Sequence, residues 1–213
     1  MSGRRTDRSA ASKAAASPSA KVAEDGAAGA SDPVGEAEEA PPSQTSLRIA
    51  RGAELIAAGN PEAAVEQFAS ALQLDPVSVP AILGLGSAYL ARGQYDAAEK
   101  EFRKALRLAP NLVDVHHHIG LTLFRRGLYS GAVQQLRRAV ELDRQHVASY
   151  LLMGESLNQI GESDAAVDAL EAALELEPES GRAFYALGIA FDRKGQPERA
   201  AEMYRRSREA GGR

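Results

Sequence analysis

The sequence predicts an all-α protein in which one helix–turn–helix unit is repeated five times to form a right-handed α-solenoid. Three columns of small residues support this prediction, because each recurs every 34 residues. The columns are Gly52, Gly86, Gly120, Gly154 and Gly188; Gly59, Gly93, Gly127, Gly161 and Gly195; and Ala64, Ala98, Ala132, Ala166 and Ala200. Such a period is typical of a stacked array without a closed core, and it directs the search for function to a surface.

Residues 1–44 precede the repeats and differ from them in composition. They are rich in Ala, Ser, Gly and Pro and contain few large apolar side chains. Because such a segment buries too little surface to offset the entropy of ordering, we expect a disordered tail. Its bases gather in residues 1–21 and its acids mostly in residues 22–44.

Each repeat begins with a predicted amphipathic helix. The repeats are residues 45–78, 79–112, 113–146, 147–180 and 181–213. When each repeat is numbered from 1, positions 4, 7, 8 and 11 fall on one helical face. Position 15 is always glycine, which ends a helix well because it readily adopts the left-handed conformation.

A second helix is predicted in the rest of each repeat. Asn60 and Pro61 are typical of a helix start, and position 18 is mostly acidic, which suits the positive end of the helix dipole. The buried face is expected at positions 20, 24, 27 and 28. Proline at position 32 ends three of these five helices, whereas Arg144 replaces it in the third repeat, where we expect a different bend.

Glycine at position 8 lies inside the first helix, where it costs about 0.5–1 kcal/mol relative to alanine. Its presence in all five repeats requires a packing reason. We expect it to face the alanine at position 20, so that the two helices approach closely. A Gly86→Leu change should then disrupt the fold far more than helix propensity predicts.

This pattern resembles the tetratricopeptide repeat. The resemblance covers all five repeats and includes small residues at positions 8, 20 and 27, an aromatic residue or Leu at 24 and Pro at 32. It implies a right-handed superhelix of ten helices whose first helices line a concave side. The sequence departs from the family at position 4, which is often Trp there and is Arg48, Ile82, His116, Tyr150 and Phe184 here.

The fifth repeat differs from the others at two columns. Position 28 is apolar until Arg208, and position 30 is Leu until Ala210. These columns are expected to contact a following repeat. Because the terminal repeat of a stack needs a polar outer face, we expect the array to end here.

Composition and charge exclude several classes of protein. The chain has no cysteine, so it forms neither disulfides nor thiolate metal sites. A net charge of −4 disfavours nucleic-acid binding. Neither an apolar run long enough to cross a membrane nor a secretory signal is visible, and we expect a cytoplasmic protein.

The expected partner-binding surface lies on the first helices, at positions 2, 5, 9, 12 and 13. It is apolar in repeats 1–3 and more polar in repeats 4–5, which suits an amphipathic helix or an extended peptide. Position 12 has an alternative role in packing between neighbouring repeats. The candidate residues are Ile49, Ala53, Leu83, Ser87, His117, Leu121, Phe124, Arg125, Leu151, Glu155, Asn158, Tyr185 and Arg193.

No catalytic, metal or cofactor motif is predicted. His116, His117 and His118 are consecutive, so their rings diverge by about 100° per residue on a helix, whereas shared metal ligands need i, i+4 spacing. We place His116 in the core and His117 and His118 toward the groove. Gly84 and Gly86 begin a nucleotide fingerprint, but a third glycine and a preceding strand are missing.

The sequence therefore predicts a non-enzymatic scaffold or adaptor that holds a partner polypeptide. Self-association through repeats 1–3 and a role as an assembly co-chaperone are the alternatives. Docking of the tail onto the array is a further hypothesis, and RNA binding by the repeats is disfavoured by charge. Because fold does not imply function, the partner itself is not predicted.

Overall fold

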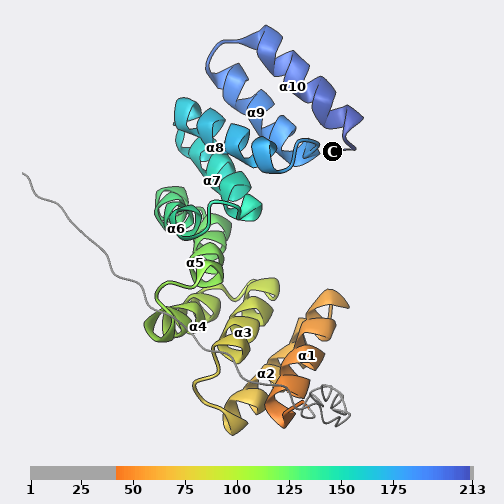
Figure 1. Ribbon diagram of the computed structural model, residues 1–213, viewed down its shortest axis with the longest axis vertical. Coiled ribbons are helices and arrows are strands. Elements are labelled where there is room, and N and C mark those ends of the chain that lie inside the picture. The colour runs from red at the N-terminus through yellow and green to blue at the C-terminus, as the bar shows by residue number, and fades with distance from the viewer. Residues whose placement is uncertain (1–41, 212–213) are drawn as a thin grey trace, which may run out of the picture. The chain divides into compact units, whose positions relative to one another are not determined.

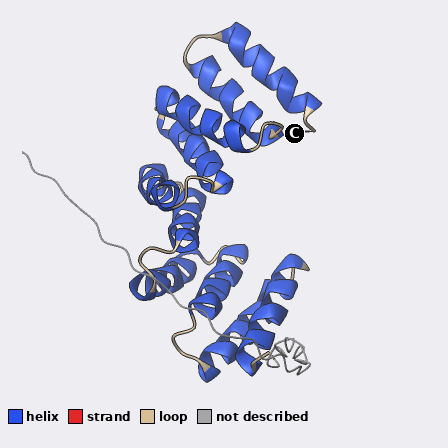
Figure 2. Cartoon of the chain, in the orientation of Figure 1, coloured by secondary structure: helices blue, strands red, loops and turns tan. Residues whose placement is uncertain are grey.

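The computed structural model describes residues 42–211 and shows ten α-helices and no strand in that range (Figures 1 and 2). The tail predicted for residues 1–44 lies outside the described residues except for its last three, and helix α1 already begins at Gln44. The helices are α1 (Gln44–Ala57), α2 (Pro61–Leu74), α3 (Val79–Ala91), α4 (Tyr95–Leu108), α5 (Val113–Arg125), α6 (Tyr129–Leu142), α7 (Val147–Ile160), α8 (Ser163–Leu176), α9 (Gly181–Arg193) and α10 (Pro197–Glu209). No helix among residues 42–211 is both long and apolar enough to span a bilayer.

The helices pack in chain order, which makes the all-α solenoid that the periodicity predicts. Each helix contacts the next, and each first helix also contacts the first helix of the following repeat. Within residues 42–211 the second helices of neighbouring repeats do not contact one another. The stack therefore curves with α1, α3, α5, α7 and α9 on its inner side.

Glycine forms the turn inside every repeat. The φ angles of the five position-15 glycines lie between +67° and +84°, the left-handed region in which a side chain is strained. This confirms the expectation for position 15. The side chain of Asn60 accepts a hydrogen bond from the amide of Ala63, so it caps α2 as predicted.

Position 8 has a different packing partner from the one expected. A Cβ atom placed on Gly86 would lie 2.5 Å from Cε1 of Phe102, and one on Gly154 would lie 2.4 Å from Cγ of Leu170. Phe102 and Leu170 occupy position 24, as do the nearest neighbours of the other three glycines in the column. The nearest side chain to position 8 is therefore that of position 24, which the sequence did not predict, and a Cβ atom at position 8 would overlap it.

The core is a series of apolar clusters shared between neighbouring repeats, and it includes Phe68, Phe102, Leu136 and Leu170. Position 30 does not belong to it, although a contact with the next repeat was expected there. Three of its leucines are exposed because they lie at the ends of the second helices, which do not contact one another: Leu74 (56 %), Leu108 (44 %) and Leu176 (38 %).

Ion pairs between position 14 and position 18 link three of the four pairs of neighbouring repeats. Arg92 pairs with Glu62 at 3.3 Å and Arg126 with Asp96 at 3.3 Å, and Lys194 pairs with Asp164. Between repeats 3 and 4 the same positions are Ile160 and Ser130, which carry no charge. The acids at position 18 thus join repeats, in addition to the dipole role expected for them.

Candidate functional site

The first helices place the candidate residues on the inner side of the array, but with unequal exposure. Ala53, Arg125, Tyr185 and Arg193 are exposed. Seven are half-buried: Ile49, Leu83, Ser87, His117, Leu121, Phe124 and Glu155. Leu151 and Asn158 are buried, at 7 % and 2 % exposure. These two candidates are corrected here, because a side chain enclosed by its own array has no surface to offer a partner.

The apolar candidates of repeats 1–3 contribute both to the core and to the surface. Ile49 packs against the cluster around Phe68, Leu83 against the cluster around Phe102, and Leu121 and Phe124 against the cluster around Leu136. Position 12 therefore does pack between helices, while part of Phe124 stays accessible. A partner would meet a firmly supported apolar surface.

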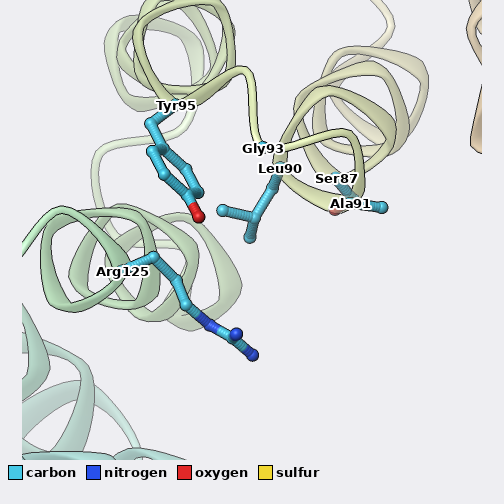
Figure 3. Close-up of a pocket in the computed structure, with 6 residues that line it drawn as sticks. All are labelled: Ser87, Leu90, Ala91, Gly93, Tyr95 and Arg125. Atoms are coloured by element: carbon cyan, nitrogen blue, oxygen red, sulfur yellow. The ribbon is translucent and has the colours of Figure 1, made fainter.

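An opening of about 380 Å³ lies between repeats 2 and 3 (Figure 3). The residues that line it are Ser87, Leu90, Ala91, Gly93, Tyr95 and Arg125. Figure 3 shows Leu90 from α3, Tyr95 from α4 and Arg125 from α5 bordering the same space. Sequence reasoning identified Ser87 and Arg125 but missed Tyr95, because it assigned the surface to first helices alone.

The polar candidates of repeats 4–5 mostly bond within the array. Nδ2 of Asn158 donates to the carbonyl oxygen of Ala186 at 2.8 Å, which links α7 to α9. Arg182 donates to both carboxylate oxygens of Glu155, at 2.6 and 2.7 Å. These hydrogen bonds raise the pKa of Arg182. The polar character that the sequence shows here is used to join repeats.

The consecutive histidines of repeat 3 contact different neighbours, and His117 is the one that bonds to repeat 4. The ring nitrogens of His116 lie 2.9 Å from the carbonyl oxygen of Pro110 and 3.1 Å from Oε1 of Gln135, so His116 is a core residue, as expected. Nδ1 of His117 lies 3.0 Å from Oγ of the buried Ser149, which joins α5 to α7. Burial, with help from His118 and His146, lowers the pKa of His117 to about 4.

His118, expected toward the groove, instead contacts repeat 2, while His146 packs beside His117. The ring of His118 stacks on Phe102 with centroids 5.1 Å apart, and burial lowers its pKa. The ring of His146 packs on His117 at 5.0 Å, and its Nδ1 accepts from the amide of Ser149 at the start of α7. Among the described residues, no three His, Cys, Asp or Glu side chains are arranged to hold a metal ion.

Family models match three parts of the chain. Two models described as tetratricopeptide repeat match residues 55–119 and 151–212. A third, described as anaphase-promoting complex, cyclosome, subunit 3, matches residues 91–173. No curated protein matches the chain.

Many solved structures are similar to this one. MamA from Desulfovibrio magneticus RS-1 aligns with a TM-score of 0.71 and 23% identity, over 81% of this chain and 97% of that chain. MamA AMB-1 aligns with a TM-score of 0.68 and 26% identity, over 77% and 97%. YrrB, whose structure is described as a TPR protein with an unusual peptide-binding site, aligns with a TM-score of 0.63 and 28% identity, over 76% and 84%.

Proposed function

The chain belongs to the tetratricopeptide repeat family, and from this premise we propose that it is a non-enzymatic scaffold that binds a peptide or helix of a partner protein along its concave side. The opening between α3 and α5 is the observation that supports this proposal most directly. The peptide-binding site described for YrrB is consistent with it.

The contact surface is proposed to be centred on repeats 1–3. There the half-buried apolar side chains are held in place by the core, so they lose little rotamer freedom when a ligand covers them. We propose the following contact residues: Ile49, Ala53, Leu83, Ser87, His117, Leu121, Phe124, Arg125, Glu155, Tyr185 and Arg193. The cytoplasmic location expected from the sequence remains a prediction.

The test compares two Ala→Trp variants of the full chain. Ala91 is an exposed residue at the rim of the opening, and Ala69 is an exposed residue on α2. The wild-type chain is used to capture proteins from an extract of its host. The Ala91→Trp variant should no longer bind these proteins, whereas the Ala69→Trp variant should still bind them, and circular dichroism should show equal helicity in all three chains. Capture of the same proteins by all three chains would contradict the proposal.

A second candidate function, self-association, is favoured by the exposed Leu74, Leu108 and Leu176. These leucines recur with the repeat, and a second copy would remove them from water. Light scattering against concentration tests this candidate. A mass that rises with concentration and returns to the monomer value in Leu108→Gln would support it, and a monomer at all concentrations would rule it out.

A further inference from the structure

We propose that Arg125 selects the partner: the opening between repeats 2 and 3 takes a segment in which an acidic side chain lies next to a bulky apolar one. The carboxylate bonds to the guanidinium of Arg125, and the apolar side chain packs on Leu90. The inference rests on the proposed function and specifies its ligand. It uses the contrast between two adjacent arginines.

Arg125 and Arg126 have different surroundings. Arg126, at position 14, pairs with Glu99 and Asp96 of the preceding repeat and serves to join repeats. Arg125, at position 13, forms no ion pair or side-chain hydrogen bond with any residue in the range 42–211, although it borders the opening. One arginine is therefore structural and the other is available to a ligand.

The groups that line the opening favour a ligand that accepts hydrogen bonds. Arg125 is a pure donor, and the hydroxyl of Tyr95 has no side-chain partner within the described part of the chain. No carboxylate lines the opening. A carboxylate can accept two parallel bonds from a guanidinium, which makes it the complementary group. The opening has a volume of about 380 Å³, which lies within the range of ligand sites, about 300–1,000 Å³.

The charge of the surrounding surface also favours an acidic partner. Positions 5, 9, 12 and 13 of repeats 1–3 include no acidic residue, and Arg125 is the one permanent charge among them. The acid of the same surface is Asp114, at position 2 of repeat 3, and it does not line the opening. Leu90 and the ring of Tyr95 supply the apolar wall. A segment that presents an acid beside a bulky apolar side chain matches both features, whereas a basic segment would be repelled.

The test selects ligands from a displayed library of short random peptides with the full wild-type chain as bait. Selected peptides should be enriched in Asp or Glu next to Leu, Ile, Met or Phe. By fluorescence anisotropy, Arg125→Gln should weaken their binding about tenfold or more, since a charge-assisted hydrogen bond is lost. The matched control is Arg137→Gln, because Arg137 is exposed on α6 and forms no ion pair within residues 42–211; it should leave affinity unchanged.

The outcomes separate this inference from the proposed function. Peptides that lose binding in Ala91→Trp but show no acid enrichment, or that tolerate Arg125→Gln, would overturn the inference and leave the proposed function standing. Peptides indifferent to Ala91→Trp, or no binders at all, would overturn both. A synthetic peptide of residues 22–41 is the remaining probe. Its binding, if lost in Arg125→Gln, would show that the chain's own acidic segment is the occupant and would overturn the assignment to a partner.

Discussion

The inner faces of repeats 1–3 and repeats 4–5 are built from the same register positions but use them differently. In repeats 1–3 most of these positions are apolar, and an opening beside them is bordered by Arg125. In repeats 4–5 three polar residues bond to the array itself: Asn158 to the backbone of α9, Glu155 to Arg182, and Asp192 to the hydroxyl of Tyr204. Burial and the bond to Asp192 raise the pKa of Tyr204 to about 12.

The difference shows that a polar side chain in the groove is not always free to bind a ligand. A side chain already bonded to its neighbours must lose those bonds before it binds a ligand, so its net contribution to binding is small. By this criterion, we propose that repeats 1–3 supply most of the binding surface, while Glu155 and Asn158 of repeats 4–5 mainly link neighbouring repeats.

The largest expected effect tests whether position 8 packs against position 24 in both halves of the array. Gly86→Leu in repeat 2 and Gly154→Leu in repeat 4 should each lower the free energy of unfolding by more than about 3 kcal/mol, because the new side chain overlaps Phe102 or Leu170. Urea unfolding measures this, with the exposed Ala53→Leu as control. Stability close to wild type in either variant would contradict the position 8–24 packing.

The next effect tests the junction between the two halves, through the dependence of the free energy of unfolding on pH. Because the pKa of His117 is about 4 in the folded chain and 6.5 in the unfolded chain, stability is full above pH 6.5 and falls as the pH drops toward 4. The loss from this group amounts to about 3 kcal/mol at the acid end. In the His117→Gln variant, the free energy of unfolding should fall by about 3 kcal/mol less than in the wild type when the pH is lowered from 6.5 to 4. Parallel pH profiles would show that His117 does not carry the effect.

A smaller effect tests whether Asn158 is structural. Asn158→Ala removes the hydrogen bond to Ala186 and should lower stability by about 1–2 kcal/mol. Peptide affinity should stay within about twofold of wild type, because the side chain is buried away from any ligand. Fluorescence anisotropy measures the peptide affinity and urea unfolding measures the stability. A large loss of affinity with little loss of stability would show that Asn158 contacts the ligand.

The smallest effect tests the ion pairs that link repeats. Glu62→Gln removes the partner of Arg92, and since both side chains are partly exposed we expect a loss of about 1 kcal/mol or less. The loss should shrink in high salt, because exposed charges are screened. The matched control is Glu66→Gln, at an exposed acid of the same helix that forms no ion pair within residues 42–211. A loss unchanged by salt would argue against an electrostatic link.

Periodicity predicted the fold almost completely, because the register of a repeat determines which residues end a helix and which face inward. The second helices start where Asn60-Pro61 and its equivalents indicate, and the position-15 glycines have the expected conformation. Contacts between the side chains of packed helices were harder to predict. Whether position 8 meets position 20 or 24 depends on side-chain direction, which spacing alone does not determine.

The candidate site was predicted in outline and corrected in detail. The polarity of Asn158 led us to expect a surface residue, but the side chain is buried. Its Nδ2 donates to the carbonyl oxygen of Ala186 in the next repeat, while its Oδ1 has no hydrogen-bond partner among the described residues. Tyr95 was missed because it begins a second helix and reaches the opening across the turn at Gly93. Both errors come from relations between repeats, which a single-repeat pattern does not contain.

The inter-repeat ion pairs have a consequence for how the array responds to its surroundings. Ion pairs with partly exposed bases link repeats 1–2, 2–3 and 4–5, whereas the bond between His117 and Ser149 links repeats 3–4, and burial lowers the pKa of His117. Ionic strength and acidity therefore act on different joints of the solenoid. Limited proteolysis in concentrated salt should favour cleavage at the charged joints, and in weak acid it should favour the loop around Arg144, so that one chain yields two distinct fragment patterns.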